Sequence, residues 1–248
     1  MITVVAGPCG TGKTTWILNA LAQLGGPAAY VNLGAESVPI DATRVGAQCP
    51  EVEIIEQLSE GAVAQRLMAG VTIFMEVGFQ LEAEFPFLQA YPHRCVAVVA
   101  EAEGEEWRSW ADELVPGNPS TLELSATRLW RGPLSGQVFD PPSADTFWQE
   151  MVRGAYGDVH RLKGILEMAD GRAFHMDFVK GLRESSYVEL NLPHWLDGRP
   201  ERFSGLEVVG QGLDEGAIAT TLEACCLSDE VLLAHQASLK QHYQGSPP

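Results

Sequence analysis

The sequence has few basic residues and no long apolar segment. Lys and Arg number 16 against 33 Asp and Glu, which gives a formal net charge of −17 at pH 7. Such a surplus repels nucleic-acid backbones and anionic lipid headgroups. No apolar run reaches the roughly 18–20 residues that a membrane span needs. We therefore expect no nucleic-acid partner and no membrane partner, although a basic pocket for one nucleotide stays compatible because its field is local.

Cysteine is present but is not spaced as a ligand set. The chain has five cysteines, an odd number, and no Cys-x-x-Cys pair. This excludes a disulfide framework and a four-thiolate zinc site, and reduced thiols are typical of a cytosolic protein. The first residues, 1–6, have no basic n-region and lead directly into a glycine loop, so no signal peptide is predicted. We expect a cytoplasmic protein.

What is present near the N-terminus is a phosphate-binding pattern. The spacing Gly-x₄-Gly-Lys-Thr is met at each fixed position by Gly7, Gly12, Lys13 and Thr14. A buried, strand-like run precedes the loop and a helix-like segment follows it, which is the context that a P-loop requires. The alternative, a glycine turn beside a surface lysine, does not account for that context.

Each residue type in the loop suits one part of a nucleoside triphosphate. Glycines let backbone N–H groups turn toward the phosphates, Lys13 places a cation against the β- and γ-phosphates, and the Thr14 hydroxyl ligates Mg²⁺. The predicted nucleotide-binding residues are Gly7, Pro8, Cys9, Gly10, Thr11, Gly12, Lys13, Thr14 and Thr15.

A P-loop enzyme also needs an acidic group at the end of a neighbouring strand. Glu76 follows an apolar run and is the best candidate, either to hold Mg²⁺ through water or to polarise the attacking water. We predict Lys13 and Glu76 as catalytic residues and Thr14 and Glu76 as the Mg²⁺ site. Asp41 is a weaker candidate for the metal or for a switch region, and its alternative interpretation is a loop-capping Asp.

The arrangement of predicted strands and helices indicates two domains. Strand-like and helix-like segments alternate over the first hundred residues, which predicts a P-loop NTPase parallel sheet with helices on both faces. Glycine and proline concentrate at 131–145 and predict a boundary there, and further strands and a helix then predict a small α+β domain. The predicted parts are a P-loop domain at 1–140, a linker at 141–157, a C-terminal domain at 158–232 and a C-terminal tail at 233–248.

Several segments, taken in order, resemble the CobW-like P-loop GTPases, a family of proposed metallochaperones. The resemblance implies nucleotide binding by the first domain and a CobW-type second domain. Besides the P-loop, the segments that carry it are Tyr30-Val31-Asn32-Leu33-Gly34, Ile40-Asp41, Val159-His160-Arg161-Leu162-Lys163-Gly164, Leu206-Glu207-Val208-Val209-Gly210, Leu213-Asp214-Glu215 and Leu222–Ser228.

The chain also departs from that family. The family's Gly-Cys-x-Cys-Cys metal motif aligns with Gly61-Ala62-Val63-Ala64-Gln65, and neither alanine nor glutamine replaces a thiolate. Zn²⁺ or Co²⁺ binding at the usual family site is therefore not expected. The guanine-reading Asn-Lys-x-Asp segment is absent from the sequence, so GTP and ATP stay equally plausible. The family's Glu-x-x-Gly shortens to Glu76-Val77-Gly78, which weakens the switch.

Three hypotheses of function follow from these residues. The leading one is a P-loop nucleoside triphosphatase that binds GTP or ATP with Mg²⁺, hydrolyses it slowly, and acts in regulation, assembly or metal homeostasis of a client protein. The alternative is a non-hydrolysing, nucleotide-dependent scaffold. A third, full metallochaperone activity, requires metal ligands outside the usual cysteine motif. Separately, His160 and His175 lie on strands predicted to pair and are a candidate two-histidine metal site, with ordinary sheet or surface histidines as the alternative. Self-association to a homo-oligomer stays open.

Overall fold

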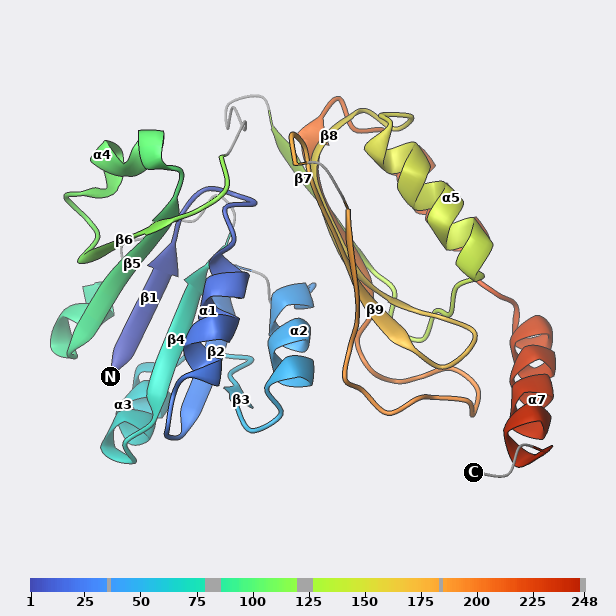
Figure 1. Ribbon diagram of the computed structural model, residues 1–248, viewed down its shortest axis with the longest axis horizontal. Helices are drawn as coiled ribbons and strands as arrows, with labels where there is room; N and C mark the ends of the chain where they lie inside the picture. Colours follow the sequence, from blue (N-terminus) through green and yellow to red (C-terminus); the bar gives the residue numbers. More distant parts are fainter. Residues whose placement is uncertain (35–36, 79–85, 120–126, 183–184, 246–248) are drawn as a thin grey trace. The chain divides into compact units, whose positions relative to one another are not determined.

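The computed structural model describes residues 1–34, 37–78, 86–119, 127–182 and 185–245, and it divides into two compact units (Figure 1). The first unit runs from residue 1 to 124 and the second from 125 to 248. In the first unit the elements are β1 Ile2–Ala6, α1 Lys13–Ala22, β2 Ala28–Leu33, α2 Ile40–Gln48, β3 Glu53–Ile54, α3 Glu60–Met68, β4 Thr72–Val77, η1 Pro86–Ala90, β5 His93–Val99, η2 Glu101–Glu103, α4 Gly104–Trp107 and β6 Glu113–Pro116.

The first unit is built on a six-stranded sheet in the order β3-β2-β4-β1-β5-β6, in which neighbouring strands run parallel. Every residue of β1 is buried, as expected for a central strand of a parallel sheet covered on both faces. Such a topology brings the carboxyl ends of β1, β2 and β4 to the same edge of the sheet. The P-loop, which follows β1, lies at that edge.

Alternate residues of these strands enter two separate hydrophobic cores. Val5, Tyr30 and Phe74 pack with side chains of α1 and α2 on one face, while strand neighbours such as Val4 and Met75 pack with α3 on the other. This period of two follows from the pleat of a strand. It also sets the direction of Tyr30, whose ring points to the face that carries the P-loop helix.

The second unit is an antiparallel sheet with helices. Its strand order is β10-β9-β8-β11-β7. The elements are β7 Arg128–Pro133, α5 Pro141–Val152, β8 Asp158–Glu167, β9 Ala173–Val179, β10 Ser186–Glu189, β11 Gly205–Gln211, α6 Glu215–Ala224 and α7 Asp229–Gly245.

One face of the second sheet forms the core of that unit. Phe147 and Trp148 of α5, which are almost fully buried, pack with Leu162 and Leu206 of the sheet and with Ile218 of α6. The fold class predicted from the sequence is confirmed: a parallel α/β sheet with helices on both faces, followed by a small α+β domain.

The boundaries of the parts differ from those predicted. The division at 124/125 places β7 in the second unit, and α5 occupies most of the predicted linker at 141–157. Asp140 caps α5 by accepting a hydrogen bond from the Ser143 N–H at 3.1 Å, with Pro141 at the first helical position. Because proline there needs no N–H partner, the Pro-Pro-Ser segment starts a helix instead of a linker. The predicted tail, 233–248, lies mostly in α7.

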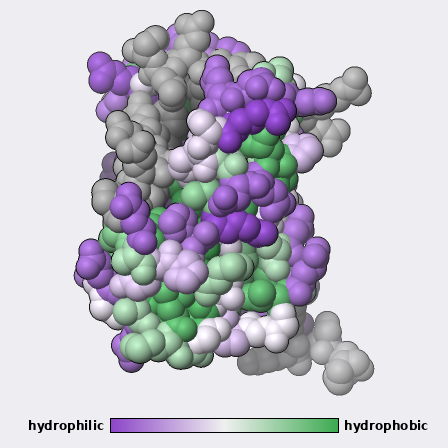
Figure 2. Space-filling model, turned by 90° about the vertical axis from the view of Figure 1, so that its left-hand side faces the viewer, coloured by the Kyte–Doolittle hydropathy of each residue, from purple (hydrophilic) through white to green (hydrophobic). Residues whose placement is uncertain are grey.

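Figure 2 shows the side of the first unit that lies at the left of Figure 1, where hydrophobic and hydrophilic residues are interspersed. Among the described residues, no helix is both long and apolar enough to cross a bilayer.

Candidate functional site

The P-loop depends on glycine at the positions that the motif fixes. Gly7 has φ 146° and Gly12 has φ 102°, both in the region that favours glycine. A Cβ at Gly7 would lie 2.1 Å from the carbonyl oxygen of Val98 in β5, whereas a Cβ at Gly12 would meet nothing within 4 Å. Glycine is therefore required at position 7 both by the backbone conformation and by the close approach of the neighbouring strand β5.

The side chain of Lys13 turns back over the loop. Its Nζ donates hydrogen bonds to the carbonyl oxygens of Gly7 at 3.0 Å and Pro8 at 3.1 Å. The Thr11 hydroxyl donates to the Pro8 carbonyl at 3.0 Å and closes the loop further. The ammonium group is thus held at the loop, in the position from which it can reach a phosphate.

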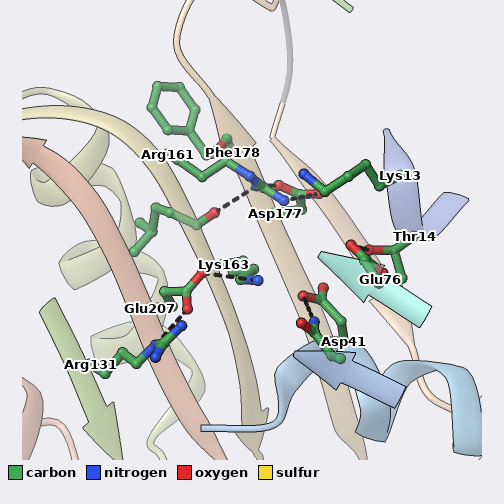
Figure 3. Close-up of polar contacts among 12 residues, drawn as sticks. Lys13, Thr14, Asp41, Glu76, Arg131, Arg161, Lys163, Asp177, Phe178 and Glu207 are labelled. Atoms are coloured by element: carbon green, nitrogen blue, oxygen red, sulfur yellow. Dashed lines mark hydrogen bonds and ion pairs between the residues drawn. The ribbon is translucent and has the colours of Figure 1, made fainter. Parts of the chain in front are cut away.

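A second strand supplies a carboxylate to the same place. Glu76 in β4 pairs in register with Val5 of β1 and Asn32 of β2, and it is only 4% exposed. The Thr14 hydroxyl donates to Glu76 Oε1 at 2.9 Å, and Figure 3 shows the two side chains pointing toward one another. Two residues that the sequence predicted as a pair, 62 positions apart, are therefore in direct contact.

Two further contacts extend this polar cluster along β2. Tyr30 is fully buried, and its hydroxyl donates to Glu76 Oε2 at 2.7 Å. Burial, together with the charges of Glu76 and Asp41, holds the pKa of Tyr30 well above its ordinary value, so the hydroxyl keeps its proton at neutral pH. The Asn32 side-chain amide donates to Asp41 Oδ2 at 2.9 Å.

The contact between Asn32 and Asp41 bears on the role of Asp41. This residue is 5% exposed and lies in the first turn of α2, where a carboxylate is favoured by the helix dipole. One of its partners is the Asn32 side chain of β2, so Asp41 ties the start of α2 to the carboxyl end of that strand. The structure brings Asp41 close to the predicted site, and its part in metal binding stays a prediction.

The loop after β6 supports the P-loop from the other side, which the sequence pattern did not indicate. The Asn118 side-chain amide donates to the Gly10 carbonyl at 3.2 Å, and its backbone N–H donates to the Thr11 carbonyl at 3.1 Å. A Cβ at Gly117 would lie 2.8 Å from the Thr11 carbonyl oxygen. A short Gly-Asn segment is thus packed against the P-loop. Because Asn118 and Gly10 lie 108 positions apart, no local sequence pattern indicates their contact.

Other candidates from the sequence do not join this cluster. His175 lies opposite Ile165 in the register of β8 and β9, whereas the His160 carbonyl accepts from the Lys180 N–H beyond the end of β9. The two histidines are therefore several residues apart along the pair. In the part of the chain that the structure describes, no group of three His, Cys, Asp or Glu side chains is placed to hold a metal ion.

The basic residues of β8 have acidic partners in the second unit. Arg161 forms an ion pair with Asp177 of β9, and Lys163 Nζ lies 2.9 Å from Glu207 Oε1 of β11. Glu207 also accepts from Arg131 of β7 at 2.7 Å, as Figure 3 shows. Neighbouring strands thus neutralise both cations, which argues against a basic face for phosphate.

The adjacent thiols of the second unit have the character of structural residues. Cys225 is buried, and the Cys226 thiol contacts the Leu222 carbonyl. Burial, with a smaller effect from Cys225, raises the pKa of Cys226 to about 11. Because the thiolate is the reactive form, Cys226 is expected to be unreactive near neutral pH.

We therefore expect Cys226 to resist alkylation by iodoacetamide in the folded protein. At pH 8 a thiol with a pKa of about 11 is roughly 0.1% thiolate, more than 100-fold less than an ordinary cysteine. Labelling should rise about tenfold per pH unit between pH 8 and 10, measured by mass spectrometry of the peptide that contains it. Protein unfolded in denaturant is the control. Rapid labelling of Cys226 at pH 8 without denaturant would contradict this assignment.

By strand order and by loop geometry, the first unit has the architecture of a P-loop domain. Comparison with known proteins places the second unit: residues 135–226 match the family described as the Cobalamin synthesis protein cobW C-terminal domain. This match agrees with the CobW-type second domain that the sequence resemblance implies. No curated protein matches the sequence.

Two solved structures are similar to the chain at low scores. The crystal structure of the Zn(II)-bound YjiA GTPase from E. coli has 12% identity and a TM-score of 0.34, and the match covers 90% of this chain and 98% of that one. A Zn(II)-bound triple mutant of YjiA GTPase has 14% identity, the same TM-score and the same coverage.

Proposed function

We propose that the first unit binds a nucleoside triphosphate, GTP or ATP, together with Mg²⁺ and hydrolyses it slowly, and that the bound state acts on a client protein. The observation that carries this proposal is the contact between Thr14 and Glu76 beside a glycine loop that holds Lys13. A hydroxyl and a carboxylate side by side at the start of the helix that follows a glycine loop suit a magnesium nucleotide.

The donor set fits Mg²⁺. Thr14 and Glu76 present oxygen atoms, which Mg²⁺ prefers. Because the Thr14 hydroxyl gives its hydrogen to Glu76, an oxygen lone pair remains for the metal. Mg²⁺, when bound, would neutralise charge that develops on the β- and γ-phosphates.

The other residues of the site act on phosphate and water. Lys13 would leave the carbonyls of Gly7 and Pro8 for the β- and γ-phosphates, since a phosphate oxygen is a stronger acceptor than a carbonyl. Backbone N–H groups of the loop and of the first turn of α1 would bind the remaining phosphate oxygens. The N–H of Thr15, a residue exposed to solvent, is one of these groups. Glu76, held from two sides, would orient the attacking water or a water of the metal.

We expect GTP and ATP to bind with dissociation constants within about tenfold of each other, because the residues after β5 are not the Asn-Lys-x-Asp that reads guanine. A buried hydrogen-bonding reader is what gives large discrimination between similar ligands. Calorimetric titration of the protein with each nucleotide in turn, in the presence of Mg²⁺, measures the two dissociation constants. A preference above 100-fold for either base would show that another segment reads it.

Phosphate release distinguishes the two classes of function. Turnover that depends on Mg²⁺ supports a nucleoside triphosphatase, whereas tight binding without turnover supports the non-hydrolysing scaffold. The absence of Zn²⁺ and Co²⁺ binding at Gly61–Gln65 remains a prediction. In the structure that segment lies in α3, and its side chains include neither Cys nor His.

A further inference from the structure

Tyr30 occupies an unusual place for a tyrosine. It lies in the interior of β2, is 0% exposed, and packs in the apolar core beneath α1 and α2. Its register partner in β4 is Phe74, and the next outward pair is Asn32 with Glu76. Tyr30 is therefore diagonal to Glu76 across two adjacent strands, a spacing that long side chains bridge.

The contacts of Glu76 are divided between its two carboxylate oxygens. Oε1 accepts from Thr14 at 2.9 Å, and Oε2 accepts from Tyr30 at 2.7 Å. A single hydrogen bond would leave the carboxylate free to rotate about its last torsion, whose energy wells are broad. Two donors, one from α1 and one from β2, fix both the position and the plane of the group.

We propose that Tyr30 is a positioning residue, whose hydroxyl holds the Glu76 carboxylate in the orientation needed for the Mg²⁺–nucleotide site. This inference rests on the function proposed above and assigns a role that no P-loop motif contains. Outer residues that orient metal-binding groups typically change metal affinity or activity by 10–100-fold when altered. The rival explanation is that Tyr30 serves only to fill the core.

Replacing Tyr30 by phenylalanine separates the two explanations, because it removes one oxygen atom and keeps the ring. We expect Tyr30→Phe to raise the Mn²⁺ concentration for half-saturation of the protein–nucleotide complex by roughly tenfold or more. That value is read directly by electron paramagnetic resonance of free Mn²⁺. kcat should fall by a similar factor, whereas nucleotide binding in EDTA should change less than about twofold.

Tyr156→Phe is a matched control in the second unit. The Tyr156 hydroxyl donates to Glu150 Oε2 at the same distance of 2.7 Å, so this variant also removes a tyrosine–glutamate hydrogen bond. It should leave Mn²⁺ affinity and kcat at the wild-type values. Thermal melting of both variants shows whether either loses its fold.

Tyr30→His keeps the test decisive if Tyr30→Phe is unstable. Histidine fills the apolar site less well than phenylalanine but carries a ring N–H that can donate. Positioning predicts that Tyr30→His retains more Mn²⁺ affinity than Tyr30→Phe, and core filling predicts the reverse order. In a Glu76→Gln background, Tyr30→Phe should cause no further loss of affinity.

The outcomes separate this inference from the proposed function. Wild-type Mn²⁺ affinity and kcat in a folded Tyr30→Phe would overturn the role of Tyr30 and leave the nucleotide function standing. A wild-type protein without nucleotide-dependent Mn²⁺ binding would overturn both.

Discussion

Lys13→Ala is expected to lower the affinity for a magnesium nucleoside triphosphate by at least about 100-fold and to abolish phosphate release. The variant removes the cation that the loop holds through the Gly7 and Pro8 carbonyls. Nothing else described in the loop carries a positive side chain, so the phosphate charge would be met by backbone N–H groups and Mg²⁺ alone. Calorimetry and a phosphate-release assay measure the two effects.

Stability should change little in the same variant. Lys13 and its two loop partners, Gly7 and Pro8, are only half-buried, so we expect a loss of about 1 kcal/mol. Lys240→Ala is the control: Lys240 lies in α7, 3.5 Å from Asp197, and its removal should leave binding and turnover intact. Undiminished turnover in Lys13→Ala would show that the P-loop is not the phosphate site.

The part of the site that could be predicted is the part formed by residues close together in the sequence. The P-loop spacing combines a strand, a glycine turn and a helix between Ile2 and Ala22, and each fixed position has a chemical reason. Glu76 could be predicted because the acid is expected at the end of a neighbouring strand, and the pairing of β1 with β4 places it there. The P-loop and Glu76 meet because β1 and β4 are parallel, and the strand–helix alternation of the sequence already indicates a parallel sheet.

The supporting residues could not be predicted in the same way. Tyr30 is one aromatic residue in an apolar strand, and only the register of β2 against β4 shows that its hydroxyl meets Glu76. Asn118 follows a strand of four residues, β6, which is too short to give a clear pattern. Long-range pairs of this kind leave no periodicity, so a single sequence does not reveal them.

The domain boundary shows how one residue type can indicate opposite structures. Pro141 and Pro142 follow a segment that contains glycine and proline, a pattern that predicts a linker. After the capping residue Asp140, however, the same prolines occupy the first turn of α5. The signal that separates the cases is the apolar spacing that follows, with Ala144, Phe147, Trp148 and Met151 buried on one face.

The polar cluster and the glycine loop place different demands on the fold. Thr14 of α1, Tyr30 of β2 and Glu76 of β4 bury hydrogen-bonding groups beside an apolar core, and each is tolerated because a partner lies within 2.9 Å. The loop instead contains backbone conformations with positive φ, which residues other than glycine rarely adopt. The stability of the first unit should therefore be most sensitive to changes at the glycine nearest to β5.

Gly7→Ala is accordingly expected to destabilise the first unit by about 3 kcal/mol or more, since strained φ/ψ regions alone cost of order 1–3 kcal/mol. The added Cβ would lie 2.1 Å from the Val98 carbonyl oxygen, a backbone atom that moves only with β5. Displacing the loop should also remove measurable nucleotide binding, because the phosphate-facing N–H groups would turn away. Urea unfolding, with nucleotide titration on the folded fraction, measures both.

Gly12→Ala is the matched comparison within the same loop. Gly12 also has a positive φ, of 102°, but its added Cβ would meet nothing within 4 Å. The variant has backbone strain but no steric clash, so its loss of folding stability should stay near 1–2 kcal/mol. Nucleotide binding should be weakened but still measurable. If the two variants were equally stable, the close approach of Gly7 to Val98 would not be what fixes the loop against the sheet. The larger cost at Gly7 would instead show that β5 acts as a structural support for the phosphate site.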